Sequence, residues 1–395
     1  MTLLKADLEP YVCSSNTTIF FKLVRKLEDI EDDSQDFNPE MTHQFFGDKE
    51  SIFGYTDLHI KLYYTAGSLK TYLGLDYGQK IDPKTSHGVE VPYFSSLPCL
   101  MSCSSLPDDV MSIIKDKLEI NLLSNLDEFS RLIEKEKLFK PYGDLLKSFS
   151  ITDENGDTHT YEIRKTDYST PGFLEYHERM QSFILWFIDA ASYIDSDDER
   201  WDFYTLYEKY EDCGTKYAFV GYSTVYKYYA YPDNYRPRIS QMLVLPPFQK
   251  QGLGATLLQA IYHHYAADSK VLDITVYRIQ VCVAAVEDPS ESFTRIRDVV
   301  DTRNCQTLPV FHPSVLRKGF TSAMWKEAQN KFKINKKQAR KVYEILRLKN
   351  IASTKSPDYR AYRLDVKQRL NAPFKVNYLF LGPLVGGVNE KPSAT

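Results

Sequence analysis

The stretch Arg238-Ile-Ser-Gln-Met-Leu-Val-Leu-Pro-Pro-Phe-Gln-Lys-Gln-Gly-Leu-Gly-Ala255 decides the fold of this chain. Its first part, Ile239 to Leu245, is apolar and β-prone, which predicts a buried strand. Two prolines then end the strand, because proline cannot donate a hydrogen bond to a sheet. The turn Gln249 to Gly254 opens directly into an amphipathic helix whose apolar positions are Leu257, Leu258, Ile261, Tyr262 and Tyr265.

A strand, a glycine-containing turn and a helix amino terminus together can bind an anion, because free backbone N–H groups and the helix dipole point at the turn. The turn has neither the Gly-Lys-Ser/Thr of a Walker loop nor the Gly-x-Gly-x-x-Gly of dinucleotide-binding proteins. It is similar to the Gln/Arg-x-x-Gly-x-Gly/Ala loop that binds acetyl-coenzyme A in GNAT acetyltransferases. On these six residues alone, a purely structural turn remains the alternative.

Size and composition narrow the class of protein. A chain of 395 residues has room for two or three domains. A net charge of −4 argues against a general nucleic-acid binder and permits a basic partner. The amino terminus has no basic segment before an apolar run, and no apolar stretch is long enough for a membrane span, so we expect neither a secretory signal nor a membrane anchor. The six cysteines form no CxxC pair, so we expect free thiols, a reducing compartment and no metal.

Periodicity predicts further elements along the chain. Strands are expected at Thr17 to Leu23, His59 to Tyr64, Lys216 to Tyr229 (as one strand or a pair) and Val271 to Val276. Helices are expected at Asp108 to Leu118, Asn125 to Leu138 and, as the longest, Phe173 to Ala191. Asn335 and Gln338 predict a capped helix through Arg347, and Ser356-Pro357 predicts the start of another through Leu370. The acidic run from Glu28 to Asp36 is typical of a solvated loop. The alternative is an acidic surface that binds a lysine-rich peptide.

Several blocks give the chain a specific resemblance to the catalytic subunits of type B histone acetyltransferases, which acetylate newly made histone H4. They run in order from about residue 11 to residue 374. The blocks are Pro39 to Asp48, Tyr176-His177-Glu178-Arg179 with Trp186-Phe187-Ile188, Asp197 to Trp201, Arg236 to Leu243, Gln249 to Gly254, Glu287-Asp288-Pro289-Ser290 and Ala339 to Arg347.

The resemblance implies a direct attack of a lysine amine on a thioester, assisted by a carboxylate base. A lysine ammonium has a reference pKa of about 10.4, so it must lose a proton before it attacks near pH 7. By resemblance that base is Glu287, with Asp288 and Asp189 as secondary candidates. The family usually has Glu at the position of Asp189, and the alternative for Asp189 is an acid on a helix surface.

The resemblance also implies cofactor and substrate contacts. The strand residues Met242, Leu243 and Val244 would hold the pantetheine arm of acetyl-CoA and polarise its thioester. The pyrophosphate would bind at Gln249, Lys250, Gln251, Gly252, Leu253, Gly254 and Ala255, with Ser290 as a further cofactor contact. A histone tail would contact Asp48, Lys49, Glu50, Trp201, Tyr226, Lys227 and Tyr228. Tyrosine and tryptophan rings can hold a lysine stem and attract its ammonium; without the resemblance, these tyrosines would be interpreted as strand packing.

Three segments depart from the family pattern: residues 92–105, the residues Val276 to Val286 before Glu287, and the tail after Lys375. Their position between intact blocks suggests the hypothesis of translated non-coding sequence or splice variation. Finding all three in the dominant mature transcript would exclude it.

The sequence therefore predicts an α/β (α+β) protein with a GNAT core. We expect an amino-terminal mixed α/β domain that contacts histone (1–150), a GNAT domain that binds acetyl-CoA (151–300), a helical carboxyl-terminal domain (301–372) and a disordered tail (373–395). The expected partners are histone H4 with histone H3 and a WD40-repeat histone chaperone, without direct DNA binding, in nucleus and cytoplasm. The alternatives are a GNAT enzyme acting on another amine and a non-catalytic histone-binding scaffold.

Overall fold

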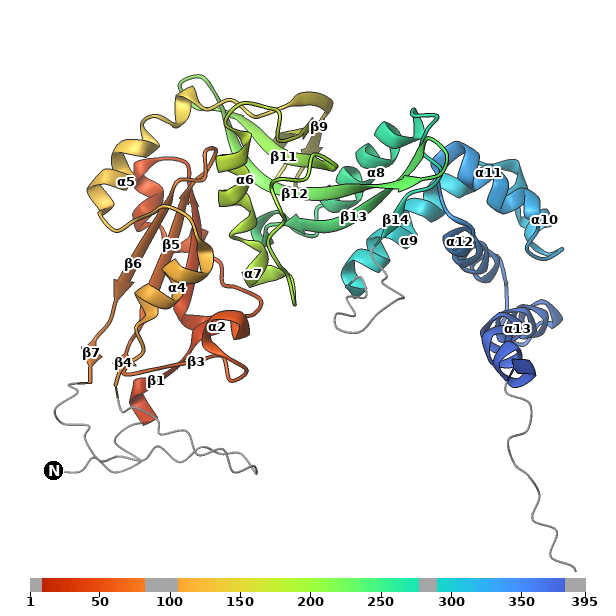
Figure 1. The fold of residues 1–395 in the computed structure, drawn as a ribbon, viewed down its shortest axis with the longest axis horizontal. Helices are drawn as coiled ribbons and strands as arrows, with labels where there is room; N and C mark the ends of the chain where they lie inside the picture. The colour runs from red at the N-terminus through yellow and green to blue at the C-terminus, as the bar shows by residue number, and fades with distance from the viewer. Residues whose placement is uncertain (1–8, 82–105, 277–289, 381–395) are drawn as a thin grey trace, which may run out of the picture.

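The computed structural model describes residues 9–81, 106–276 and 290–380, the last eight of these as backbone only. The described residues form an elongated molecule (Figure 1). An amino-terminal part lies at one end, a large twisted sheet in the middle and a group of helices at the carboxyl end. Several residues named in the sequence analysis lie outside the described ranges: residues 92–105, residues 277–286, Glu287, Asp288 and the chain after Phe380.

The central sheet has six strands in the order β14-β13-β12-β11-β10-β9. All neighbours are antiparallel except β13 and β14, which are parallel and joined through a helix. The bounds are β9 (Asp144–Thr152), β10 (Thr158–Thr166), β11 (Trp201–Glu211), β12 (Thr215–Ala230), β13 (Asn234–Val244) and β14 (Thr275–Val276). Lys216 to Tyr229 is thus one long strand, whereas sequence patterns did not predict β9, β10 or β11.

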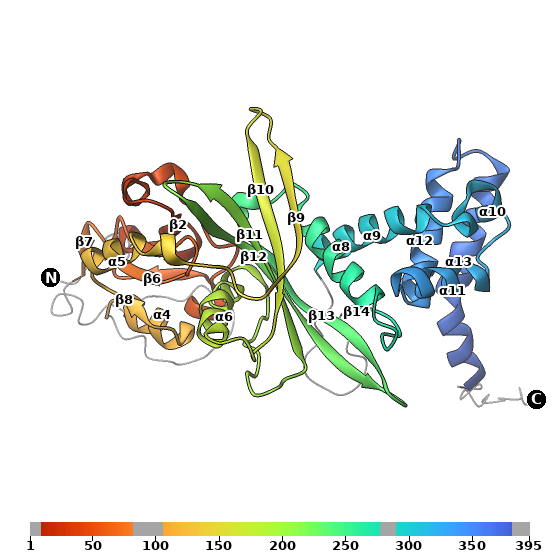
Figure 2. The same ribbon diagram turned by 90° about the horizontal axis from the view of Figure 1, so that it is seen from above.

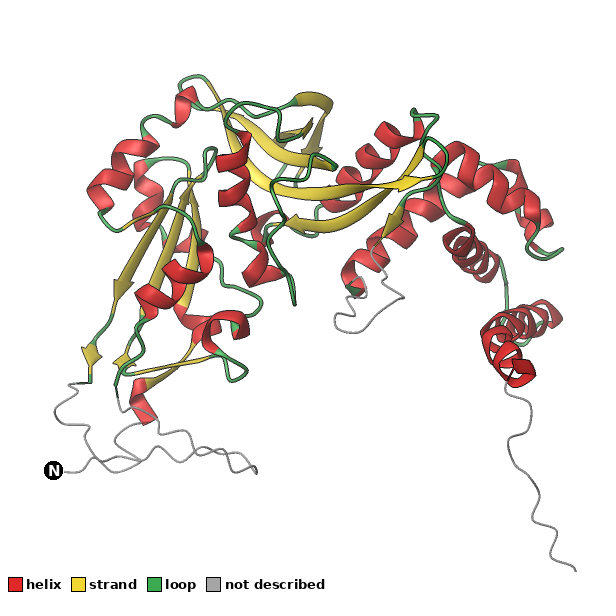
Figure 3. Ribbon diagram, in the orientation of Figure 1, coloured by secondary structure: helices red, strands yellow, loops and turns green. Residues whose placement is uncertain are grey.

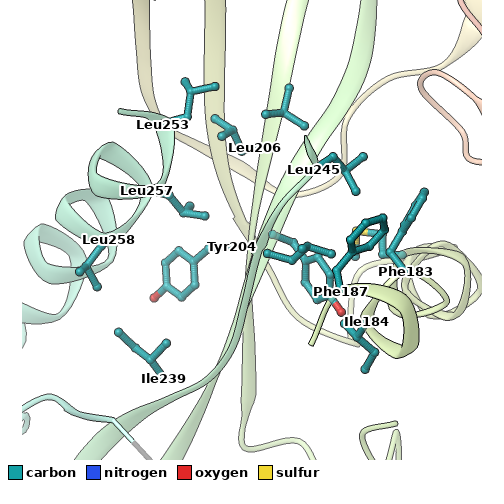
Figure 4. Close-up of a cluster of buried hydrophobic side chains, with 14 of the residues drawn as sticks. Phe183, Ile184, Phe187, Tyr204, Leu206, Ile239, Leu245, Leu253, Leu257 and Leu258 are labelled. Atoms are coloured by element: carbon teal, nitrogen blue, oxygen red, sulfur yellow. The ribbon is translucent and has the colours of Figure 1, made fainter. Parts of the chain in front are cut away.

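Helices cover both faces of this sheet, which explains why β11 and β12 are continuous buried runs rather than alternating ones. Helix α8 (Leu253–Ala266) packs on one face, where Tyr204 points toward Leu257 and Leu258 (Figure 4). The short helices α6 (Phe173–Gln181) and α7 (Ile184–Phe187) lie on the opposite face, with Phe183 and Phe187 turned to the strands.

The prediction of one continuous helix from Phe173 to Ala191 is wrong. The helix breaks at Ser182, whose hydroxyl donates to the carbonyl of Arg179 at 2.7 Å. Such local serine bonds compete with the helical ladder. The chain leaves helical geometry again at Ile188, and Ala190 has a φ of +53°. The apolar stripe of the predicted helix is nevertheless core, since Tyr176, Met180, Phe183, Ile184 and Phe187 are all buried.

The amino-terminal part is built on a four-stranded sheet in the order β2-β5-β6-β8 (Figure 3). Its strands are β2 (Ile19–Val24), β5 (His59–Thr65), β6 (Thr71–Asp76) and β8 (Leu122–Leu123), with two small pairs formed by β1 (Val12–Ser14), β3 (Ser51–Phe53), β4 (Tyr55–Thr56) and β7 (Gln79–Lys80). The helices are α2 (Ser15–Thr18), α3 (His43–Phe46), α4 (Val110–Leu118) and α5 (Leu126–Ile133). The predicted strands and helices here are confirmed to within a few residues, except that Asn125 to Leu138 ends in a separate short 3₁₀ turn.

The carboxyl-terminal part is helical, as predicted. It contains α9 (Glu291–Gln306), α10 (Pro313–Leu316), α11 (Ser322–Phe332), α12 (Lys336–Lys349) and α13 (Pro357–Phe380). The side chain of Asn335 caps α12 by accepting from the N–H of Gln338 at 2.9 Å, but the Gln338 amide donates to Asp298 instead of closing the box. Helix α13 runs past its predicted end at Leu370 and past residue 373, where a disordered tail was expected.

Among the described residues, no helix is both long and apolar enough to span a lipid bilayer. The same residues contain no group of three or more His, Cys, Asp or Glu side chains suited to a metal ion. Cys13, Cys213 and Cys305 are free thiols.

Candidate active site

The predicted anion loop lies at the carboxyl end of β13. A short turn, Pro246–Phe248, follows the strand, and α8 begins at Leu253 with Gly252 as its N-cap. The helical ladder starts where the N–H of Thr256 donates to the carbonyl of Gly252 at 3.1 Å. The N–H groups of Gly252, Leu253, Gly254 and Ala255 therefore precede the ladder and face the loop at the positive end of the helix.

The side chains of the loop hold its shape instead of filling it. The amide of Gln249 donates to the carbonyl of Val244 at 2.9 Å, and the Tyr161 hydroxyl donates to the Gln251 side chain at 3.2 Å. Gly252 has a φ of +80°, and a methyl group there would meet no atom within 4 Å. Lys250 is exposed and also has a positive φ, of +64°. The loop thus presents open space in front of backbone N–H groups, which fits a pyrophosphate.

At position 254, a glycine is favoured by close packing and not by an open space in front of it. A methyl group on it would lie 3.3 Å from Cδ1 of Ile296 and 3.6 Å from Cε of Met242. Helix α9 therefore packs directly against the start of α8. Ser290 begins α9 as its N-cap, with its hydroxyl accepting from the N–H of Phe293 at 3.2 Å.

Strand β13 is paired on both edges for only part of its length. It pairs with β14 at Arg238 and Ile239. A bulge follows, because Thr224 and Val225 of β12 pair with Gln241 and Ile239 and leave the exposed Ser240 out of register. Beyond the bulge, no strand in the part of the chain that the structure describes pairs with the far edge of Met242, Leu243 and Val244. This edge can bind an extended amide-containing chain.

Asp189 is the one predicted catalytic residue within the described ranges. Its exposed carboxylate follows α7 and lies 3.3 Å from Nε2 of His43 on α3. The segment that carries it is fixed to the sheet next to the bulge, since the Gln241 amide donates to the carbonyl of Ser192 at 3.0 Å. The buried Gln241 is itself held by its neighbours on β12, including Thr224. Asp189 is therefore tied to the middle of β13.

Three predicted substrate residues form an aromatic cluster, defined as Trp201, Tyr226 and Tyr228. The Trp201 and Tyr226 rings meet edge to face at 4.9 Å, and the Tyr226 and Tyr228 rings at 4.5 Å. Trp201 pairs with Tyr226 across the strands, and Tyr226 pairs with Arg238. The cluster therefore lies on one face, at the end of β13 opposite the anion loop.

Charged side chains surround this cluster. The Arg238 guanidinium stacks 4.0 Å above the Tyr228 ring, and Arg200 lies 4.8 Å from the Tyr226 ring. The Tyr226 hydroxyl donates to Asp198 at 2.8 Å. The side-chain bond from Arg200 is the main reason that the pKa of Asp198 is well below its usual range. Burial, followed by that hydrogen bond, raises the pKa of Tyr226.

Lys227 lies apart from the tyrosines beside it in sequence. Successive residues of a strand point to opposite faces, and Lys227 contacts Asp202 at 3.2 Å. The same carboxylate accepts from Tyr265 of α8 at 2.7 Å. Lys227 is thus on the α8 face, whereas the aromatic cluster is on the other.

The predicted contacts at 48–50 have different environments. Asp48 and Lys49 are exposed on a turn. The Glu50 side chain instead forms hydrogen bonds within the amino-terminal part. Its carboxylate accepts from the N–H groups of Thr42 (2.7 Å) and His43 (3.1 Å) and from the Asn16 amide (2.6 Å). The Thr42 bond is the main reason that the Glu50 pKa is lowered. Nδ1 of His43 lies 3.9 Å from Glu50, so His43 stands between Glu50 and Asp189.

The described site is therefore arranged along one strand. The seven residues from Arg238 to Val244 span ~20 Å of extended chain. The aromatic cluster lies at one end, the anion loop lies past the other end, and Gln241 lies between them. Sequence patterns gave no role to His43, Gln241, Arg200 or Arg238, although all four fall within or beside the quoted blocks.

A mixed sheet with two parallel strands joined through a helix, an opening on one edge of the first and an anion loop at its end define the GNAT class of acetyltransferases. In agreement, a family model described as "Acetyltransferase (GNAT) family" matches residues 159–282. Models described as "Histone acetyl transferase HAT1 N-terminus" and "Histone acetyltransferase type B catalytic subunit, C-terminal" match residues 11–189 and 297–348.

Curated relatives define the family further. The chain is 46% identical over 370 residues to a protein named "Histone acetyltransferase type B catalytic subunit" from Homo sapiens, covering 93% of this chain and 82% of that one. It is 31% identical to the protein of that name from Cryptococcus neoformans, and the match covers 98% of this chain and 94% of that one. The chain belongs to the family of type B histone acetyltransferase catalytic subunits and is an acyltransferase.

Among solved structures, an aminoglycoside acetyltransferase from an uncultured soil metagenomic sample, in complex with trehalose, is similar at 14% identity with a TM-score of 0.24. The matched region covers 34% of this chain and 82% of the aminoglycoside acetyltransferase chain.

Proposed function

We propose that this enzyme transfers acetyl from acetyl-CoA to lysine side chains in the amino-terminal tail of newly synthesised histone H4. The observation that carries the proposal is the linear order along β13: anion loop, free strand edge, Asp189 segment and aromatic cluster. It allows a nucleotide-bearing thioester to enter from one end and a lysine from the other.

The donor fits the described residues. Acetyl-CoA, which GNAT enzymes use, supplies an activated acetyl group on a thioester. The N–H groups of Gly252 to Ala255 and the open space over Gly252 would hold its pyrophosphate. The free edge of Met242, Leu243 and Val244 would hold the amides of its arm and orient the carbonyl. Ser290 would contact the donor from the start of α9.

The acceptor must lose a proton before it attacks. We propose Glu287 as the base that takes this proton, with Asp288 or Asp189 as alternatives. Trp201, Tyr226 and Tyr228 would surround the lysine stem and attract its ammonium. Asp48 and Lys49, which are exposed, would contact neighbouring residues of the tail, and Asp48 would favour a basic peptide over a neutral one. Glu50 is bonded within the amino-terminal part and Lys227 lies on the α8 face, so we propose no direct tail contact for either. The attack is direct, so no cysteine intermediate is required.

The proposal extends to the setting of the enzyme. Its substrate would be histone H4 together with histone H3, delivered by a WD40-repeat histone chaperone, and the enzyme would act in both cytoplasm and nucleus. Cell fractionation and recovery of the chaperone with the tagged full-length protein test these points.

One assay tests the reaction. Purified full-length protein is incubated with acetyl-CoA and an H4 tail peptide, and acetyl-lysine is measured by mass spectrometry for the wild type, Glu287→Gln and Asp189→Asn. We expect acetylation by the wild type and a loss of about 10²-fold or more in Glu287→Gln, the usual scale for a general base. Full activity of Glu287→Gln would remove Glu287 as the base.

Two further measurements distinguish this function from the alternatives, a GNAT enzyme for another amine and a non-catalytic scaffold. Faster acetylation of a free polyamine or of a protein amino terminus than of the H4 peptide would identify a GNAT enzyme for another amine. Histone binding without detectable acetyl-CoA binding, measured by calorimetry, would identify a scaffold.

A further inference from the structure

The carboxyl-terminal helices carry a charge opposite to that of the whole chain. Residues 331–370 contain 13 Lys and Arg against three Asp and Glu, whereas the complete chain has a net charge of −4. Such asymmetry between parts of a chain indicates a surface for an anionic partner.

Most acidic side chains of this region form hydrogen bonds to other residues within it. Asp365 of α13 accepts from Arg340 (2.7 Å), Tyr343 (2.9 Å) and Arg347 (3.1 Å), all on α12. The half-buried network continues where Arg369 of α13 donates to the buried Glu344 at 2.6 Å. These bonds fix one side of α13 against α12.

The other side of α13 is cationic. Arg360, Arg363 and Lys367 are exposed at helical spacing, and Lys355 is exposed just before the helix. We define this set of four as the basic face. All four line one surface hollow together with Thr354, Ser356, Tyr359 and Leu364. Arg363 and Lys367 are four residues apart and repel one another in the absence of an anion, which costs a few tenths of a kcal/mol.

An apolar residue lies within the same face. Leu364 is 54% exposed and sits one helical turn after Arg360. Leu370 is also exposed, at 52%, toward the end of the side chains described on α13. Figure 2 shows the far half of α13 standing clear of the other helices. A surface that combines four cations with an exposed leucine matches a segment that combines carboxylates with apolar side chains.

We propose that the basic face of α13 is a docking surface for an acidic, leucine-containing segment of another protein. A nucleic-acid backbone would satisfy the cations but would leave Leu364 without an apolar partner. The proposal is independent of acetyl transfer, because no residue of the β13 site belongs to the basic face.

The test uses the full-length protein and a fluorescein-labelled synthetic peptide of repeated Glu-Glu-Leu-Asp units, with binding measured by fluorescence anisotropy. The test variant is the triple charge reversal Arg360→Glu, Arg363→Glu and Lys367→Glu. The matched control is Lys115→Glu, Lys137→Glu and Lys140→Glu, which reverses three exposed lysines of the amino-terminal part. Melting temperatures of both variants show whether folding is unchanged.

We expect the wild type and the control to bind the peptide, more weakly as salt is added. The α13 triple variant should bind at least about tenfold more weakly, as expected for three partly screened charge contacts. A peptide with the leucines replaced by serine should also bind less well. Equal loss in both variants, or no binding by the wild type, would overturn the proposal. So would tighter binding of duplex DNA than of the peptide, or self-association of the wild type that the triple variant abolishes in the absence of peptide binding.

Discussion

Nε2 of His43 lies 3.3 Å from a carboxylate oxygen of Asp189 and joins the amino-terminal part to the segment beside β13. Its other ring nitrogen, Nδ1, lies 3.9 Å from Glu50. One imidazole therefore lies between a residue beside the proposed reaction centre and a residue of the turn predicted to meet the histone tail. We expect His43 to act as a positioning residue for Asp189.

Replacing His43 by Ala should lower kcat on the H4 peptide by about tenfold, as supporting partners of functional groups usually do, with a smaller change in KM. His43→Gln, which keeps a donor, should recover part of the loss. Steady-state kinetics of both variants measure this. His59→Gln, which changes an exposed histidine of β5, is the control. Equal kcat for His43→Ala and the wild type would contradict the role.

Replacing Gly252 by Ala tests the anion loop. A non-glycine residue at a φ of +80° costs about 1–2 kcal/mol of stability, and the added methyl group would occupy the space in front of the N–H groups. We expect weaker acetyl-CoA binding by calorimetry. Gly156→Ala is a matched control, because Gly156 has a φ of +92° and the same open space but lies in the β9–β10 turn. Both variants should lose similar stability, and only Gly252→Ala should lose affinity. Similar affinities for the two would argue against a pyrophosphate at this loop.

The aromatic cluster should determine the affinity for the peptide. Tyr226→Leu removes a ring that touches both Trp201 and Tyr228. A cation–π contact of this kind contributes roughly 0.5–2 kcal/mol, so KM for the H4 peptide should rise by about two- to thirtyfold while acetyl-CoA binding is unchanged. Tyr229→Leu, at a 69% exposed position on the same strand, is the control. An unchanged KM in Tyr226→Leu would show that the cluster is strand packing.

Asp301 should make stability depend on pH. Burial raises the pKa of this carboxyl group on α9 to about 6, although Arg297 lies 3.4 Å away. An unfolded chain releases the same proton near pH 4. The folded state therefore binds more protons between pH 4 and about 6, and this group's contribution to stability falls as the pH rises through that window.

Asp301→Asn removes this titration, so the stability of the variant relative to the wild type should increase from pH 4 to pH 6. At low pH the variant and the wild type should be of similar stability, because Asp301 is then protonated and neutral in the folded wild type as well. Urea unfolding at several pH values measures the difference. A difference that stays constant across the window would show that Asp301 does not titrate there.

The parts of the fold that depend on local patterns could be predicted from the sequence. The β13 strand, the prolines after it, the glycine turn and α8 follow one another within 33 residues, and the conformation of each follows from its own residues. The break at Ser182 could not be predicted from periodicity, because the apolar stripe continues through it. The β9 and β10 strands are half exposed and lack a strong alternating pattern.

The parts of the site that depend on distant contacts could not be predicted. The bonds of Glu50 to Thr42 and Asn16 become visible only when α3 is folded against the start of the chain. The contact between His43 and Asp189 joins residues far apart in sequence, and the block that contains His43 gives no indication of its partner. Glu287 and Asp288 lie outside the described residues, so their roles remain predictions from resemblance.

The continuity of the hydrophobic core determines how the molecule unfolds. Buried side chains in mutual contact run without interruption from Ile19 in the amino-terminal part through Trp186 and Tyr222 to Leu346 in α12. Phe45 stacks on Trp186 at 3.6 Å, directly across the join between the first two parts. The boundaries expected near residues 150 and 300 thus fall inside one packed interior. The described chain should melt in a single cooperative transition, and a fragment limited to 151–300 would expose the aromatic surface that normally meets its neighbours and would aggregate.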